Sequence, residues 1–187
     1  FYSKILLFGE YGIIQDSKGL SIPYNFYNGA LKNDGNSSES AMKSNESLKK
    51  FVVYLEQLQA EQPELVTFNL EVLKQDVNSG MYFDSSIPQG YGVGSSGALV
   101  AAIYDKYAND KITVLENLTR EKLLQLKTIF SQMESFFHGK SSGLDPLNSY
   151  LSIPILINSK DNIEATGIPT QSTQGKGAVF LIDSGIV

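Results

Sequence analysis

The sequence contains no cysteine and no tryptophan, and only one of its 187 residues is histidine. Without cysteine the chain cannot form a disulfide, bind zinc through thiolates or use a cysteine nucleophile. A single imidazole, that of His138, also excludes a metal site built from several histidines. The absence of cysteine is typical of proteins from a reducing compartment, so we expect a cytoplasmic protein.

Excess positive charge and long apolar runs are also missing. The formal net charge is −5 and the isoelectric point is about 4.9, whereas nucleic-acid binding usually needs a basic surface. No apolar run approaches the length of a membrane span. We therefore expect no nucleic acid and no membrane as a partner, which leaves a small-molecule substrate and a homodimer open.

The densest motif is the glycine-rich stretch PQGYGVGSSGALVAA at residues 88–102. Four glycines and two serines fall within residues 90–97, and good helix formers follow at once. Glycine lets a backbone approach a ligand closely, and the free N–H groups at a helix N-terminus attract anions. The stretch therefore predicts a phosphate-binding loop that leads into a helix over residues 95–107.

Helical periodicity predicts two further helices with one apolar face each. The first, capped by Asn45, should follow a polar, turn-rich segment at residues 32–43. The second, capped by Thr119, should end at His138. The residues expected to be buried are Leu48, Phe51, Val52, Leu55 and Leu58 in the first helix, and Leu123, Leu126, Phe130, Met133 and Phe137 in the second.

Apolar or alternating runs predict strands, and residues 158–177 read as loop. The expected strands lie at residues 4–8, 19–31, 66–70, 81–87, 151–157 and 178–182. The order of these elements indicates an α+β fold rather than regular βαβ alternation. Three aromatic residues crowd the second strand, Tyr24, Phe26 and Tyr27, and we interpret them as cross-strand packing rather than a ligand wall.

A second dense motif, HGKSSGLDP, occupies residues 138–146. Phosphoryl transfer needs donors around the phosphates, a divalent metal, a cation and a group that positions the acceptor hydroxyl. Ser96 and Glu134 carry oxygen atoms of the kind that Mg²⁺ prefers. Asp145 can accept a hydroxyl proton, and Lys4 can polarise that hydroxyl or lower the pKa of the carboxylate. Spacing alone does not bring these four residues together.

Each of these residues also has an ordinary structural interpretation. Taken alone, Lys4 would be a solvated strand end and Glu134 an exposed helix carboxylate. Asp145, which precedes a proline, would be a cap or turn residue. We expect His138 to cap the end of its helix, where a cation is favoured.

Three segments, in this order along the chain, resemble the GHMP kinase family, and mevalonate kinases most of all. KILLFGE at residues 4–10 resembles the N-terminal motif, and residues 88–98 resemble the signature P-x-x-x-G-L-G-S-S-A-A. HGKSSGLD at residues 138–145 resembles H-G-N-P-S-G-V-D and is the closest match. The resemblance implies an α+β fold of the ribosomal protein S5 domain 2-like type, with a mixed sheet packed with helices.

The same resemblance implies a function and a domain boundary. Residues 1–187 would form the N-terminal, ATP-binding domain, with the C-terminal domain absent from this sequence and the fragment inactive alone. The activity would be ATP-dependent phosphorylation of mevalonate in isoprenoid precursor biosynthesis, with ATP and Mg²⁺ as cofactors. Asp145 and Lys4 would be catalytic, and Ser96 and Glu134 would hold the metal. The residues implied to surround the ATP phosphates are Gly90, Tyr91, Gly92, Val93, Gly94, Ser95 and Ser96.

Several departures from the family pattern concern the acceptor. Tyr11 stands where mevalonate kinases usually have a histidine, Lys140 replaces the common asparagine, and Gly97 replaces the first alanine after the serine pair. We assign Glu10, Tyr11 and Lys140 to the acceptor site. Phosphomevalonate, homoserine or a sugar therefore stays open as the acceptor, as does a non-catalytic nucleotide-binding module.

A hydrolase triad is a third class of function. It would use Ser95 or Ser96 with His138 and Asp145. The nucleophile elbow requires the pattern G-x-S-x-G. Neither serine has glycine both two positions before it and two positions after it, so the sequence disfavours a hydrolase.

Overall fold

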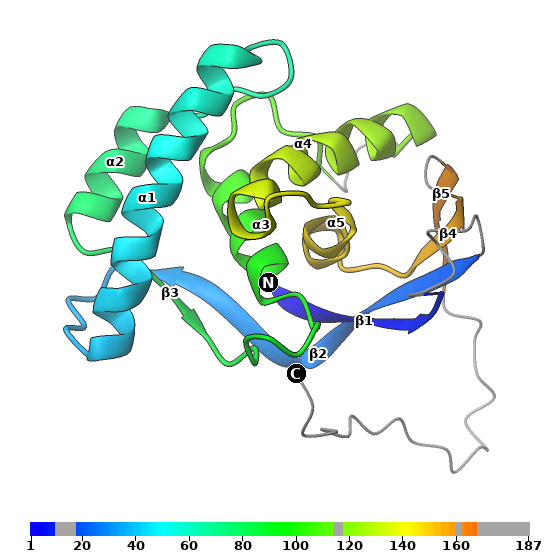
Figure 1. Cartoon of the computed structure of the whole chain (residues 1–187), viewed down its shortest axis with the longest axis horizontal. Helices are drawn as coiled ribbons and strands as arrows, with labels where there is room; N and C mark the ends of the chain where they lie inside the picture. The colour runs from blue at the N-terminus through cyan, green and yellow to red at the C-terminus, as the bar shows by residue number, and fades with distance from the viewer. Residues whose placement is uncertain (10–17, 114–117, 160–161, 168–187) are drawn as a thin grey trace.

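The computed structural model describes residues 1–9, 18–113, 118–159 and 162–167 of the chain. Within these residues a five-stranded sheet is packed with five helices, which confirms the predicted α+β class (Figure 1). None of the described helices is both long enough and apolar enough to cross a membrane.

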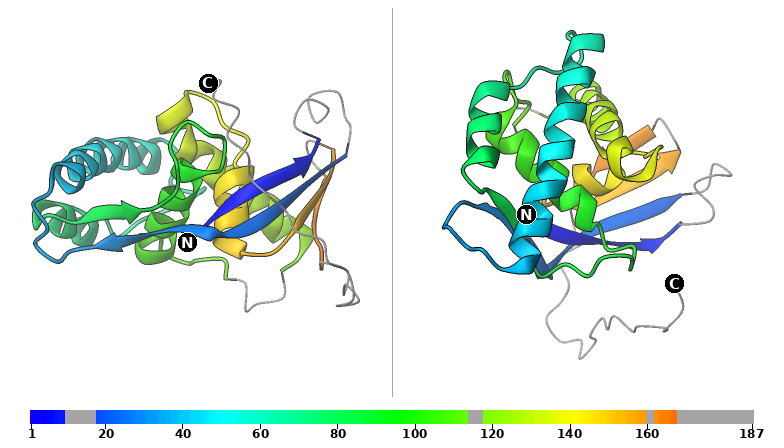
Figure 2. Two further views of the ribbon diagram at one scale, coloured as in Figure 1. Left: turned by 90° about the horizontal axis from the view of Figure 1, so that it is seen from below. Right: turned by 60° about the vertical axis from the view of Figure 1, so that its left-hand side comes forward.

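The sheet consists of β1 (Tyr2–Phe8), β2 (Gly19–Lys32), β3 (Tyr82–Ser85), β4 (Ile155–Ser159) and β5 (Asn162–Ala165). The strand order is β1-β2-β4-β5, and β3 also pairs with β2. All pairings between these strands are antiparallel. The resemblance implied a mixed sheet, but over the described residues the sheet is antiparallel throughout. The helices gather on one face of this sheet (Figure 2).

The helices are α1 (Glu39–Glu61), α2 (Leu70–Asn78), α3 (Ser95–Tyr107), α4 (Arg120–His138) and α5 (Leu144–Leu151). The limits of α3 agree with the prediction, and α4 begins after the predicted cap, because the Thr119 side chain accepts a hydrogen bond from the N–H of Lys122. The predicted apolar faces form the core: all five residues in α1 and four of the five in α4 are buried, while Phe137 is partly buried.

The predicted start of α1 is wrong. Ser38, not Asn45, caps this helix, and its side chain accepts a hydrogen bond from the N–H of Ala41. Asn45 lies inside α1, where its side-chain amide donates to the carbonyl oxygens of Val77 and Met81. An asparagine that favours a cap by its local propensity is instead used in a tertiary contact with the end of α2.

Two strand predictions also need correction. Residues 66–70 form no strand: Phe68 makes an isolated bridge with Ala108, and Asn69 caps α2, a helix that the periodicity did not indicate. The run at residues 151–157 is divided, because α5 extends to Leu151 and β4 starts only at Ile155. Strand β5 lies within the predicted loop at residues 158–177, and the strand predicted at residues 178–182 lies outside the described residues.

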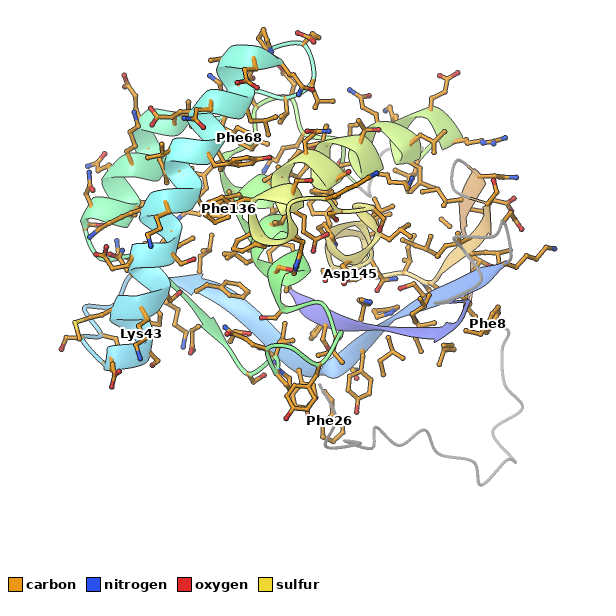
Figure 3. The ribbon with its side chains drawn as sticks, viewed as in Figure 1. Phe8, Phe26, Lys43, Phe68, Phe136 and Asp145 are labelled. Atoms are coloured by element: carbon orange, nitrogen blue, oxygen red, sulfur yellow. The ribbon has the colours of Figure 1, made fainter. Side chains whose placement is uncertain are left out.

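The aromatic group on β2 packs along its own strand rather than across strands. Its ring centroids are 5.9 to 6.3 Å apart. Phe26 is 76% exposed and lies on the far side of the sheet from the helices (Figure 3). Tyr27 packs against a small buried cluster of Ile87, Val93 and Ala98. This cluster joins the sheet to the glycine-rich loop.

Candidate active site

The glycine-rich loop is held at its C-terminal end by β1 and by the small buried cluster. The carbonyl of Val93 accepts a hydrogen bond of 3.0 Å from the N–H of Lys4, and the Val93 side chain is buried. Gly94, with φ of +83°, is the N-cap of α3 in the left-handed conformation that favours glycine. No side chain caps α3, so the first N–H groups of this helix remain available to an anion.

The loop lines a cavity of about 890 Å³, a size typical of small-molecule sites. The loop residues at its wall are Gly90, Gly92, Val93, Gly94, Ser95 and Ser96. Tyr91 is 55% exposed and is not among the described residues that line the cavity. The start of α1 also lines the cavity, with Lys43 and Ser44 among its residues there. The sequence did not indicate this contribution, because α1 begins earlier than predicted.

Lys4 and Asp145 form an ion pair beside this cavity. The Lys4 Nζ atom is 3.0 Å from Asp145 Oδ1. Lys4 is buried on β1 at 8% exposure, where it pairs in register with Pro23. Asp145 lies in the first turn of α5 and lines the cavity, at the centre of the molecule in Figure 3. The structure therefore joins a lysine and a carboxylate that are 141 positions apart in the sequence (145 − 4).

Gly97 sets how closely α3 approaches α5. A Cβ atom at this position would lie 2.8 Å from both the carbonyl carbon of Asp145 and the nitrogen of Pro146. Contacts this short require the backbone to shift, so only glycine fits here without displacing the start of α5. The departure from the family signature at Gly97 therefore has a physical reason in this chain: Asp145 is held by direct backbone packing against α3.

Ser96 and Glu134 also meet at the cavity side of α3. The Ser96 hydroxyl donates a 2.9 Å hydrogen bond to Glu134 Oε1, and the Ser141 hydroxyl donates to Oε2. Glu134 is only 3% exposed, so its interpretation as an exposed helix carboxylate is wrong. Burial, and then the negative charge of Asp145, raise the pKa of Glu134, although the two serine hydrogen bonds act in the opposite direction.

Ser141 is a site residue that sequence reasoning missed. It lies in the motif at residues 138–146, and its side chain also accepts a hydrogen bond from the N–H of Gly143. The Ser131 hydroxyl in turn donates to the carbonyl of Ser141 at 2.6 Å. The motif displays the serine, but only the turn that follows α4 determines which carboxylate it contacts.

The prediction that His138 caps α4 needs correction: His138 is the last residue of the helix, and Gly139 is its C-cap. The His138 Nε2 atom is 2.9 Å from Ser96 Oγ, and the His138 side chain lines the cavity. This contact supplies two members of the hydrolase triad considered above. The third is engaged elsewhere, because Asp145 pairs with Lys4, and no contact between Asp145 and His138 is found among the described residues.

The acceptor residues are the least defined part of the predicted site. Lys140 is exposed in the turn between α4 and α5, and it is not among the described residues that line the cavity. Glu10 and Tyr11 lie outside the described residues. The structure thus brings together Lys4, Asp145, Ser96 and Glu134 around the loop, and it leaves the predicted acceptor contacts as predictions.

Two comparisons with known proteins bear on this arrangement. A search of curated proteins found no match for the chain. The family model described as "GHMP kinases N terminal domain" matches residues 52–152, which is more than half of the 187 residues. The matched region contains the glycine-rich loop, Ser96, Glu134 and Asp145, whereas Lys4 precedes it.

Proposed function

We propose an acceptor and a mechanism for this chain, which belongs to the GHMP kinase family through its N-terminal domain. Members of this family are ATP-dependent kinases. We propose that the acceptor is the hydroxyl of mevalonate, and the resemblance of residues 138–145 to the mevalonate kinase motif supports this choice. The observation that carries the proposed chemistry is the Lys4–Asp145 ion pair at 3.0 Å, beside the cavity that the loop lines.

ATP would bind with its phosphates against the glycine-rich loop. The uncapped N-terminus of α3 offers N–H donors and a positive end of the helix dipole. The serine hydroxyl of Ser95 lines the same cavity. Val93 anchors the C-terminal end of the loop, next to α3, to β1 and to the small buried cluster.

Ser96 and Glu134 suit a divalent cation that arrives with the nucleotide. Among the described residues no group of three or more acidic or histidine side chains could hold a metal. Mg²⁺ is commonly bound by one or two protein oxygens together with substrate phosphates. Adjacent ligands at about 2.1 Å from an octahedral Mg²⁺ lie about 3.0 Å apart, and Ser96 Oγ and Glu134 Oε1 are 2.9 Å apart. A bound Mg²⁺ would neutralise charge on the transferred phosphoryl group.

Asp145 and Lys4 would act on the acceptor. Asp145 orients the hydroxyl and accepts its proton while the hydroxyl oxygen forms a new bond to the γ-phosphorus. The bond from the γ-phosphorus to the bridging oxygen breaks in the same in-line displacement, and ADP leaves. Lys4 pairs with Asp145 at 3.0 Å and stabilises the charge that develops nearby. No phosphorylated enzyme is required.

An ADP-release assay on the intact protein tests this proposal. Mevalonate, phosphomevalonate, homoserine and galactose are compared at equal concentration, with an acceptor-free reaction as the control. We expect mevalonate to give the highest kcat/KM. A preference for another acceptor would refute mevalonate but keep the kinase chemistry. ATP binding without transfer to any acceptor would instead support the non-catalytic module.

A further inference from the structure

Ser96 lies between two side chains that are one helical turn apart on α4. Its Oγ atom is 2.9 Å from Glu134 Oε1 and 2.9 Å from His138 Nε2. A serine hydroxyl has one proton and two acceptor lone pairs. It therefore cannot donate a hydrogen bond to both neighbours. The direction of its single O–H bond determines where the lone pairs of Ser96 point.

Without a cation, the hydrogen of the Ser96 hydroxyl points toward Glu134. Ser96 donates its hydroxyl hydrogen to Glu134 Oε1, so the 2.9 Å contact with His138 is made by a ring N–H at Nε2 that donates to Ser96. A divalent cation shared by Ser96 Oγ and Glu134 Oε1 requires lone pairs from both oxygens. The Ser96 hydroxyl must then turn its hydrogen away from Glu134. In the described structure, His138 Nε2 is the other polar side-chain atom that contacts Ser96.

We propose that His138 is a positioning residue for the metal site: its Nε2 atom accepts a hydrogen bond from the Ser96 hydroxyl and so turns a lone pair of Ser96 toward the cation. This inference rests on the proposed function, because the cation is the one that accompanies ATP. It assigns the ring proton of His138 to Nδ1 in the metal-bound protein. It also gives the histidine that follows the apolar stripe of α4 a role beyond ending that helix.

His138 is well suited to a substitution test. It is the last residue of α4 and is exposed, and its ring lies 6.5 Å from that of Phe137 between centroids. Replacing it therefore removes no core contact. Glutamine can place an amide oxygen near the position of Nε2 and keeps an acceptor there, whereas leucine keeps the bulk and removes the acceptor.

The experiment measures Mn²⁺ binding by electron paramagnetic resonance in the presence of a non-hydrolysable ATP analogue. Mn²⁺ replaces Mg²⁺ at oxygen-rich sites. We expect His138→Leu to weaken Mn²⁺ binding by about 10- to 100-fold, the range for loss of a group that orients a metal ligand. His138→Gln should retain most of the affinity. In EDTA, all three proteins should bind the analogue equally.

The outcomes separate this inference from the proposed function. Wild-type Mn²⁺ affinity in His138→Leu would overturn the inference and leave the proposed function intact. Equal losses in the leucine and glutamine variants, or weaker analogue binding in EDTA, would also overturn it, because neither follows from a missing acceptor. If the wild-type protein took up no Mn²⁺ with the analogue, the proposed metal site would fail and this inference with it.

Discussion

Two carboxylates near opposite ends of α3 have similar partners and opposite electrostatics. Glu134, at the N-terminal end, accepts hydrogen bonds from the hydroxyls of Ser96 and Ser141. Asp76, at the C-terminal end, accepts one from Lys106 Nζ at 2.8 Å and one from the Tyr107 hydroxyl at 2.6 Å. Each carboxylate therefore has two donors, but only Asp76 has a cation among them.

The pKa shifts follow this difference. Hydrogen bonds from Lys106 and Tyr107 lower the pKa of Asp76, whereas burial and the nearby Asp145 raise the pKa of Glu134. The protein thus gives Asp76 a cationic donor at the C-terminal end of α3, whereas Glu134 at the N-terminal end has only hydroxyl donors and the nearby Lys4 pairs with Asp145. A buried carboxylate without a cation lowers stability, and such a cost is typical of a functional site.

Of the substitutions that test the comparison between Glu134 and Asp76, removing the charge of Glu134 should have the largest effect. In Glu134→Gln we expect Mn²⁺ affinity, measured with an ATP analogue, to fall by at least about 100-fold, since losing a ligand costs more than losing its support. The melting temperature of the ligand-free protein should rise by a few degrees at pH 7, because the pKa of Glu134 is higher in the folded chain than in the unfolded one. Its ionisation therefore favours unfolding once the pH exceeds the unfolded-state pKa. A lower melting temperature with unchanged Mn²⁺ binding would contradict this account.

A smaller effect should follow from displacing Asp145 while all the charges are kept. Gly97→Ala puts a methyl group against the backbone of Asp145 and Pro146. We expect turnover to fall by about 10- to 100-fold, because a displacement near 1 Å has effects of this size on catalysis. Gly167→Ala is the matched control, since a Cβ atom there meets nothing within 4 Å. Equal turnover in the two variants would show that α3 and α5 can separate without consequence.

The smallest effect is expected at the C-terminal end of α3, where Asp76 pairs with Lys106 and Tyr107. Asp76→Asn should leave turnover unchanged and reduce the free energy of unfolding by about 1 kcal/mol at neutral pH, since the carboxylate is partly solvated. The folded-state pKa of Asp76 is lowered, so its stabilisation is complete above the unfolded-state pKa and is lost as the pH falls through the folded-state pKa. Urea titrations at several pH values should therefore show the difference from wild type shrinking in acid. A difference that grew in acid would refute this assignment.

The sequence predicts the surroundings of the N-terminal end of α3, at the cavity, better than those of its C-terminal end. The glycine-rich loop is specified by residues that are neighbours in the sequence. Glycines followed by helix formers define the loop and the limits of α3 without help from distant residues. Asn45 was predicted as a helix cap, but its side chain instead makes a tertiary contact with Val77 and Met81. Asn69 lies in the run that predicted a strand, but its side chain caps α2. The Ser141–Glu134 and Ser96–His138 contacts depend on how α3, α4 and the turn after α4 meet, which periodicity does not specify.

Turnover and ATP affinity of Asp145→Asn, measured together in the intact protein, test the central claim most directly. The asparagine keeps the shape of the side chain beside Lys4 but can no longer take up the proton of the substrate hydroxyl. We predict a loss of turnover of about 100- to 10,000-fold, the range for a positioned base, with the Kd for ATP nearly unchanged. Turnover equal to that of the wild type would contradict the assignment of Asp145 and, with it, the proposed phosphoryl-transfer centre.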